Sequence, residues 1–171
     1  MTVINKKIYK MIFDSFPILF LFIVVFTGFD LSFNFIFNVS FNFVYILIFY
    51  WVLKKPEILG FGLIFLAGII NDVLLNLPIG VTSVNYLLLC AVASFLRDRT
   101  LSPSIIFDWM VFFPSILVVN SIYFINLTLI FEIPISYPDL MVNSFFTFFV
   151  YPIFAKIFHT INLISKKKEN A

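Results

Sequence analysis

Few side chains in this sequence could carry chemistry, and the most prominent are an amide and a carboxylate at the end of an apolar run. In GIINDVLLNLPIG, residues 68–80, Asn71 and Asp72 precede a leucine-rich stretch and a Pro-Ile-Gly turn. A carboxylate in apolar surroundings is costly, so such an acid either stabilises local structure or takes part in function. Further polar side chains that could interact with it follow closely in the sequence: Asn76, Thr82, Ser83 and Asn85.

Residues suited to catalysis or metal binding are scarce. Cys90 is the only cysteine and His159 the only histidine, which excludes an internal disulfide, a cysteine metal site and a histidine cluster. There is no Ser/His/Asp set with suitable placement, no pair of carboxylates at a common depth and no phosphate-binding loop. We therefore predict no catalytic, cofactor-binding or metal-binding residues, and a protein that is not an enzyme. We also predict no nucleic-acid site, because Lys166–Lys168 is the longest basic run.

The composition indicates a membrane protein. The chain of 171 residues is 62% hydrophobic and only 12% charged, and its mean hydropathy is +1.09. Lipid must solvate most of such a surface. We predict one all-α integral membrane domain, residues 1–171, with six transmembrane helices. The apolar runs that would form these helices are 16–29, 41–53, 61–75, 81–96, 105–131 and 140–164.

The second, third and fourth runs are short for a membrane crossing, which needs about 20 residues. Their helices must either include flanking residues or meet other helices inside the protein.

The basic residues indicate the orientation of these helices. All eleven Lys and Arg residues lie before the first run, after the second, after the fourth, or in and after the end of the sixth. Six crossings with the N-terminus inside place every one of them on the cytoplasmic side, as the positive-inside rule requires. Five crossings would place one basic cluster outside. We therefore predict that the N- and C-termini both lie on the cytoplasmic side of the membrane.

Two interpretations of Asp72 stay open. It lies about 20 Å from the cytoplasmic turn that precedes its helix, in the outer part of the bilayer, where no Lys or Arg is available to pair with it. In the structural interpretation it caps the next helix or closes the hairpin turn that Pro78 and Gly80 form. In the functional interpretation Asn71 and Asp72 present an amide and an acid to a partner protein.

We expect structural roles for several other residues in or near the apolar runs. Gly60, Gly62 and Gly68 should let their helix pack closely, because small residues allow backbones to approach. Asp108 should be solvated or paired with Arg97 or Arg99. Trp109 should anchor the inner interface. Two prolines should kink their helices, with the freed carbonyls satisfied by neighbouring helices: Pro114 and Pro152.

Polar and apolar residues nearly alternate between Ser32 and Phe43. A period of two is typical of an extended segment, which here would lie at the membrane interface. The alternative is a broken helix whose asparagines face protein, because an isolated strand in a membrane has unpaired edges.

The stretch YILIFYWVLKKPEILGFGLIFLAGIINDVLLNLPIGVTSVNYLLL, residues 45–89, resembles the MreD family of bacterial rod shape-determining proteins. In that family a Tyr-Trp pair ends one span, a Pro and a Gly-x-Gly open the next, and a Gly, an Asp four residues later and an Ile-Gly turn close it. The matching residues here are Tyr50, Trp51, Pro56, Gly60, Gly62, Gly68, Asp72 and Gly80. The sequence departs from the pattern at Asn76, where a small residue is common.

The resemblance implies a non-enzymatic inner-membrane subunit of the cell-elongation complex that helps to organise peptidoglycan synthesis. Its implied partners are the single-span periplasmic protein MreC, the enzymes RodA and a class B penicillin-binding protein, the actin-like MreB and membrane lipid. It also implies a fold similar to the substrate-binding S-components of energy-coupling-factor transporters. In this setting Asn71 and Asp72 would lock the helical hairpin or contact a partner such as MreC.

That fold supplies the rival function, a vitamin-like small-molecule-binding subunit of an energy-coupling-factor transporter. Two features speak against it. The first run, Phe16–Phe29, contains no alanine for an Ala-x-x-x-Ala docking face. The outer loops also lack the converging polar groups that a vitamin pocket needs. A membrane scaffold of another family is the third possibility.

Overall fold

The computed structural model describes the backbone of residues 3–28, 41–99 and 104–170, and the side chains of residues 13, 15–28, 41–99 and 104–164. This part of the chain is helical and contains no strand, so the all-α prediction is confirmed. The elements are α1 (Val3–Thr27), α2 (Phe43–Lys54), α3 (Phe61–Leu74), α4 (Val81–Arg99), α5 (Ile105–Ile125), the π-helical turn η1 (Asn126–Ile130) and α6 (Tyr137–Asn170).

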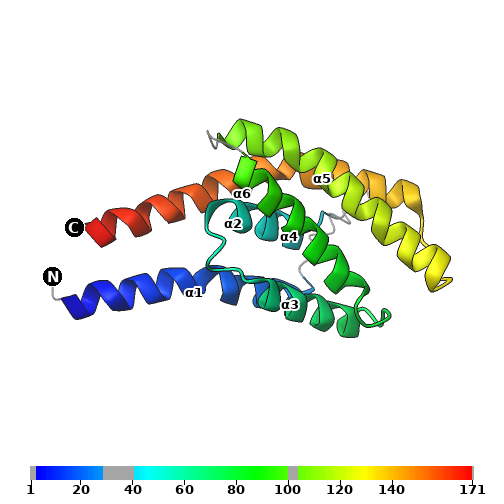
Figure 1. The fold of residues 1–171 in the computed structure, drawn as a ribbon, viewed down its shortest axis with the longest axis horizontal. Coiled ribbons are helices and arrows are strands. Elements are labelled where there is room, and N and C mark those ends of the chain that lie inside the picture. The colour runs from blue at the N-terminus through cyan, green and yellow to red at the C-terminus, as the bar shows by residue number, and fades with distance from the viewer. Residues whose placement is uncertain (1–2, 29–40, 100–103, 171) are drawn as a thin grey trace.

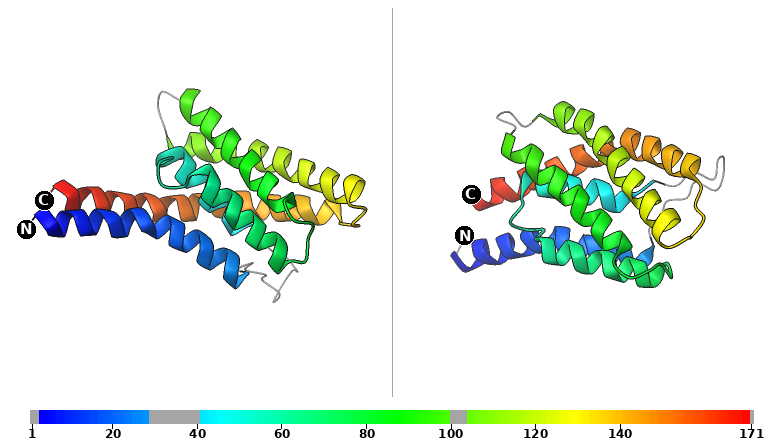
Figure 2. Two further views of the ribbon diagram at one scale, coloured as in Figure 1. Left: turned by 60° about the horizontal axis from the view of Figure 1, so that its bottom comes forward. Right: turned by 45° about the vertical axis from the view of Figure 1, so that its right-hand side comes forward.

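Successive helices run in alternating directions, and both chain ends lie at the same end of the bundle (Figure 1). The helices that follow each other pack as pairs, α3 against α4 and α5 against α6. The N-terminal half of α1 and the C-terminal half of α6 lie side by side and extend past the other helices (Figure 2). Each helix coincides with one of the predicted apolar runs.

The shortest helix, α2, lies at the centre of the bundle. It packs against α1, α4 and α6, and its ten residues from Phe43 to Val52 are all buried. Twelve residues rise only about 18 Å, less than the hydrocarbon thickness. Because α2 is surrounded by protein, it has no lipid-facing side and does not need the length of a lipid-exposed helix.

Among the residues whose side chains are described, three helices are long and apolar enough to cross a membrane: Val81–Arg99, Ile105–Ile130 and Tyr137–Ile164. The same residues form three shorter apolar helical segments: Ser15–Thr27, Phe43–Lys54 and Phe61–Leu74. Large apolar side chains project from the outer faces of α5 and α6, including Met110, Phe149 and Ile153, each more than half exposed. Exposing so much apolar surface to water is unfavourable, and a lipid environment accounts for it. These features fit a membrane protein.

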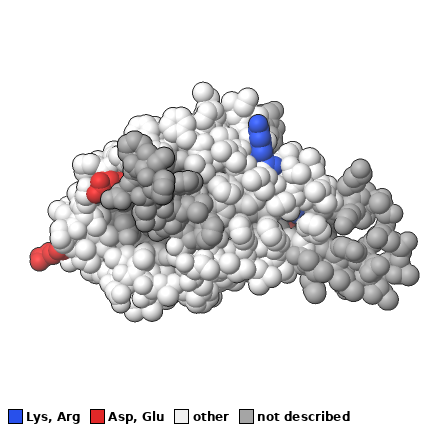
Figure 3. Space-filling model, turned by 180° about the vertical axis from the view of Figure 1, so that it is seen from behind, with Lys and Arg blue, Asp and Glu red and all other residues white. Residues whose placement is uncertain are grey.

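Charged side chains lie at both ends of the bundle. The last turns of α2 and α4 carry Lys54, Arg97 and Arg99 at the end where the termini lie. Glu132 and Asp139 lie where α5 connects to α6, at the opposite end. On the face drawn in Figure 3, the two most prominent groups of acidic atoms lie towards one end, and the prominent basic atoms lie farther towards the other.

Most of the alternating segment, residues 32–40, lies outside the described residues. Its last part leads into α2. The Asn42 side chain caps α2 by accepting from the Tyr45 N–H at 3.2 Å. The Asn42 N–H in turn donates to Thr147 Oγ1 of α6 at 2.9 Å. The start of the central helix is therefore tied to the last helix.

Helices α5 and α6 are joined by a hydrogen bond that a proline makes possible. Pro152 lies inside α6 and has no N–H to donate to the carbonyl four residues earlier, that of Phe148. The Trp109 indole N–H of α5 donates to this carbonyl at 2.9 Å. The rings of Trp109 and Phe148 also stack, with their centroids 4.9 Å apart. The predicted rescue of a freed carbonyl is thus confirmed at Pro152, and Trp109 has a packing role that its position near the interface did not reveal.

Replacing Trp109 with phenylalanine should lower the free energy of unfolding by about 1–2 kcal/mol, because the Phe148 carbonyl loses its donor in a buried position. The Pro152→Ala variant restores an N–H at position 152 that can satisfy this carbonyl within α6. Trp109→Phe should therefore cost less in the Pro152→Ala background, and a double-mutant cycle on SDS-induced unfolding measures this coupling. Additive effects of the two substitutions would contradict the proposed rescue.

Candidate functional site

The Asp72 carboxylate caps the start of α4. Its Oδ2 atom accepts from the Gly80 N–H at 2.8 Å, and its Oδ1 atom accepts from the Thr82 N–H at 2.9 Å. The first N–H groups of a helix have no partner within the helix, and a negative charge there is further favoured by the helix dipole. Asp72 therefore supplies the cap that Gly80, which has no side chain, cannot provide.

The backbone of Asp72 also closes the end of α3. The Leu77 N–H donates to the Asp72 carbonyl at 2.9 Å, and the Asn76 N–H donates to the Val73 carbonyl at 3.3 Å. These two bonds form a Schellman motif, which needs a residue with positive φ between them. Asn76 takes this position with a φ of 54°, and asparagine tolerates the left-handed region better than most residues. This explains why asparagine can stand where the resembling family has a small residue.

The geometry at Asp72 agrees with the structural interpretation, in which the carboxylate caps the next helix. The side chain is completely buried, with 0% exposure, and both carboxylate oxygens accept hydrogen bonds from the hairpin itself. A partner protein docking on this surface would not touch the carboxylate. Asn71 is half-buried and lines a cavity towards the bundle interior instead.

Gly68 brings α3 and α4 into direct backbone contact. A Cβ atom at this position would overlap the Ser83 Cα atom and lie 2.6 Å from Ser83 N. The close approach also lets the Ser83 hydroxyl donate to the Phe65 carbonyl of α3 at 3.1 Å. The prediction of close packing at Gly68 is therefore confirmed.

The same prediction is wrong for Gly60 and Gly62. Both residues are exposed, and no described atom lies within 4 Å of the Cβ position of either. Gly60 caps the start of α3 rather than lying inside it. Gly60 and Gly68 are eight residues apart and were expected to share one helical face, but only Gly68 of these glycines lies against the α4 backbone.

The Gly68→Ala variant should lose about 1–3 kcal/mol of stability, because the new methyl group meets the Ser83 backbone, which cannot move away without shifting α4. Gly62→Ala is the matched control, since the same helix gains the same methyl group in open space. That control should be neutral or stabilising by up to about 1 kcal/mol through helix propensity. Equal thermal stabilities of the two purified variants in detergent would contradict the contact at Gly68.

The remaining motif residues do not join Asp72. Tyr50 and Trp51 are buried near the other end of the bundle, where their rings lie 5.3 Å and 6.0 Å from the Phe158 ring of α6. Pro56 is exposed in the connection between α2 and α3. Pro78 belongs to the hairpin turn, where its carbonyl accepts from the Val81 N–H. The structure thus brings together Gly68, Asp72, Pro78 and Gly80, while the Tyr-Trp pair and Pro56 lie elsewhere.

A chain of polar side chains crosses the bundle on the hairpin side. The Tyr45 hydroxyl of α2 accepts from the Asn85 amide of α4 and donates to Asn120 Oδ1 of α5 at 3.1 Å. The Asn120 amide donates to Ser144 Oγ of α6 at 2.7 Å. Four helices are therefore connected by side-chain hydrogen bonds, as the expected role of membrane amides suggests.

A cavity of about 190 Å³ lies beside this chain of side chains. Seven uncharged polar residues line it together with apolar ones: Asn42, Tyr45, Asn71, Tyr86, Asn120, Tyr123 and Asn143. The expectation concerned the outer loops, whereas most of these polar groups come from the helices. These amides come from four different runs, so that only the folded bundle brings them together.

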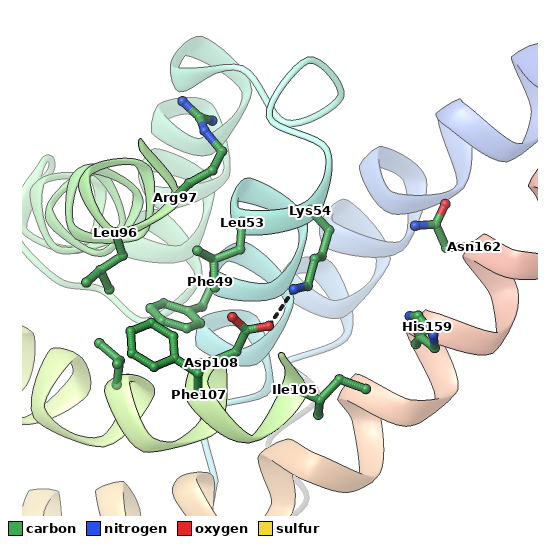
Figure 4. A pocket seen from close by; sticks show the side chains of 11 residues that line it. Phe49, Leu53, Lys54, Leu96, Arg97, Ile105, Phe107, Asp108, His159 and Asn162 are labelled. Carbon is green, nitrogen blue, oxygen red and sulfur yellow. Dashed lines mark ion pairs between the residues drawn. The ribbon is translucent and has the colours of Figure 1, made fainter. Parts of the chain in front are cut away.

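A second cavity, of about 340 Å³, lies at the basic end of the bundle between α2, α4, α5 and α6 (Figure 4). Lys54 Nζ and Asp108 Oδ2 form an ion pair of 2.6 Å in its wall, with 16% and 5% of the two side chains exposed. The expectation that Asp108 is solvated or pairs with Arg97 or Arg99 is therefore wrong. Arg97 pairs with its exposed neighbour Asp98 instead.

Neither cavity contains an arrangement suited to metal binding. No group of three or more His, Cys, Asp or Glu side chains lies together among the residues whose side chains are described. The arrangement around Asp72 can fix the shape of a helical hairpin. The 190 Å³ cavity can accept hydrogen-bonding groups without charge, and the 340 Å³ cavity offers cationic side chains to an occupant.

Comparisons of this chain with models of protein families, with curated proteins and with solved structures give no match. The resemblance to the MreD family therefore rests on the motif residues between positions 45 and 89.

Proposed function

We propose that this chain is a non-enzymatic membrane subunit of the MreD type that binds an MreC-like single-span protein in the bacterial inner membrane. The observation that carries the proposal is the hairpin of α3 and α4. Its motif residues Gly68, Asp72 and Gly80 each have a defined structural role, and together they determine how the two helices pack. Because these motif residues have structural roles, they support membership in a family that shares the motif.

The proposed placement has six membrane crossings with both termini inside. The alternating directions of the helices and the common position of the termini support it. The short helices α2 and α3 count as crossings because they pack within the bundle. On this placement the hairpin turn lies at the periplasmic side, where the body of an MreC-like protein and the wall-synthesis enzymes are found.

The test is affinity purification of the tagged chain from its own membranes in a mild detergent, followed by native mass spectrometry. The expected result is a complex with a single-span protein that has a periplasmic domain. Depletion of the chain should also make the cells lose their rod shape. A polytopic membrane protein of similar size with the same tag is the control. Normal cell width after depletion, together with no such complex, would overturn the proposal.

The second candidate is a small-molecule-binding subunit of a transporter. The cavity of about 190 Å³ beside the chain of polar side chains favours it. Its amides and hydroxyls, without charged groups, suit an uncharged polar ligand. The same mass spectrum separates the two functions. A stoichiometric small molecule, or co-purifying transporter subunits with an ATPase, would replace the first candidate by the second.

A further inference from the structure

The cavity at the basic end of the bundle combines apolar walls with a cationic opening (Figure 4). The walls include Phe49 and Leu53 of α2, Leu96 of α4 and Ile105 of α5. Lys54 and Arg97 lie on one side of the opening, and His159 and Asn162 of α6 lie on the other. Neither the motif nor the proposed partner accounts for this site.

The charges that line the cavity do not balance. Among the lining residues, Lys54 and Arg97 contribute two positive charges and Asp108 one negative charge. Asp98 pairs with Arg97 through Nε and Nη2, but it is 66% exposed and does not line the cavity. Such an exposed ion pair is weak. The exposed fraction of the Arg97 side chain is 32%, and its Nη1 atom reaches only the Val52 carbonyl, at 3.5 Å. That contact is long for a hydrogen bond, so this donor is available to a better acceptor. A negatively charged occupant would give Arg97 an acceptor inside the cavity.

One buried polar atom indicates a further feature of the occupant. The Oδ1 atom of Asn162 is buried and has no hydrogen-bond partner among the described residues. Buried acceptors rarely remain without a donor. An occupant that carries a hydroxyl group beside its negative charge would satisfy both Asn162 and the cations.

We propose that this cavity binds the headgroup of an anionic phospholipid of the phosphatidylglycerol class. Its phosphodiester carries one negative charge, which lies between Arg97 and Lys54, and a glycerol hydroxyl donates to Asn162. Basic pockets between membrane helices on the cytoplasmic side are suited to such headgroups. The apolar wall residues contact the first part of an acyl chain. The proposal rests on the membrane placement proposed above, but not on the identity of any protein partner.

The test is native mass spectrometry of the purified chain with defined lipids of identical acyl chains. We expect phosphatidylglycerol to remain bound at one copy per chain and phosphatidylcholine, which has no net charge, to be lost. The Arg97→Gln variant should retain about tenfold less phosphatidylglycerol, since a charge-assisted bond is worth a factor of this order. Arg99→Gln is the matched control. It removes the same charge from the same turn of α4, but Arg99 lies over the Phe95 ring and does not line the cavity, so retention should change less than about twofold.

Equal losses in the two variants would mean that the lipid responds only to the general basic charge of this end, and would overturn the proposal. Equal retention of the two lipids by the unaltered chain would also overturn it. Displacement of the lipid by millimolar inorganic phosphate would assign the cavity to a soluble anion instead. None of these results bears on whether an MreC-like protein co-purifies, so the lipid site and the proposed function can fail separately.

Discussion

Replacing Asp72 with alanine should lower the free energy of unfolding by roughly 2–5 kcal/mol, because the Gly80 and Thr82 N–H groups both lose their acceptor. The Thr82 N–H is buried, so water cannot replace the carboxylate there without opening the hairpin. The α3–α4 pair should then separate first, and the chain should be less abundant in membranes. Unfolding by SDS, followed by the helical circular dichroism signal, measures the loss.

The Asp72→Asn variant sharpens this test. Both carboxylate oxygens accept from backbone N–H groups, whereas an asparagine amide has only one oxygen and would direct an NH₂ group at the second N–H. We therefore expect asparagine to destabilise the protein by about 1–3 kcal/mol rather than to be tolerated. Asp139→Asn, at an exposed position in the first turn of α6, is the control and should change stability by less than about 1 kcal/mol. A fully stable Asp72→Asn protein that has lost a partner would restore the recognition interpretation.

The second large effect is expected at the ion pair between α2 and α5. The Asp108→Ala variant leaves the Lys54 ammonium without its carboxylate in a position that is only 16% exposed. Breaking a buried pair on one side costs about 3–5 kcal/mol, because the remaining charge is not compensated. The expected result is a large fall in the thermal stability of the purified protein.

The double variant Lys54→Met with Asp108→Leu provides the internal comparison. A buried ion pair replaced by apolar residues of similar size is often neutral or stabilising. The double variant should therefore recover most of the stability that Asp108→Ala loses. If Asp108→Ala is as stable as the unaltered chain, the ion pair is solvated and the geometry described for it is wrong. Asp98→Ala, on an exposed acid, is the control for the loss of a surface charge.

The helices were predictable because long apolar runs separated by polar or basic residues have few alternatives in lipid. Each run overlaps a helix. The shortness of the second run left two alternatives open, and the structure shows the second of them, a helix that meets others inside the protein. The run does not reveal that α2 is the central helix. The ten buried residues of α2 are apolar or aromatic on every side of the helix. A sequence without a distinct polar face does not indicate on which sides of the helix its neighbours lie.

Contacts between distant residues could be predicted only in part. The capping interpretation of Asp72 needed only its neighbours in sequence, and the hairpin turn brings them together. Asp108 illustrates the opposite case, since its partner Lys54 is 54 positions away and two nearer arginines offered the same charge. Gly60 and Gly68 show that helical spacing identifies a shared face without telling how far along it another helix makes contact. For Trp109, the proline four residues after its acceptor was a usable signal, because a proline in a helix leaves one carbonyl free at a known position.

The central position of α2 has a consequence for the synthesis of the protein. Tyr45 of α2 forms hydrogen bonds with Asn85 of α4 and Asn120 of α5. Phe49 of α2 packs against the rings of Phe112 in α5 and Tyr151 in α6. Asn42, which caps α2, donates to Thr147 of α6. All of these partners leave the ribosome after α2. While the chain emerges, α2 must stay in the insertion machinery or in lipid with its Tyr45 hydroxyl unsatisfied. The interior of this bundle therefore closes only when the last helix has been made.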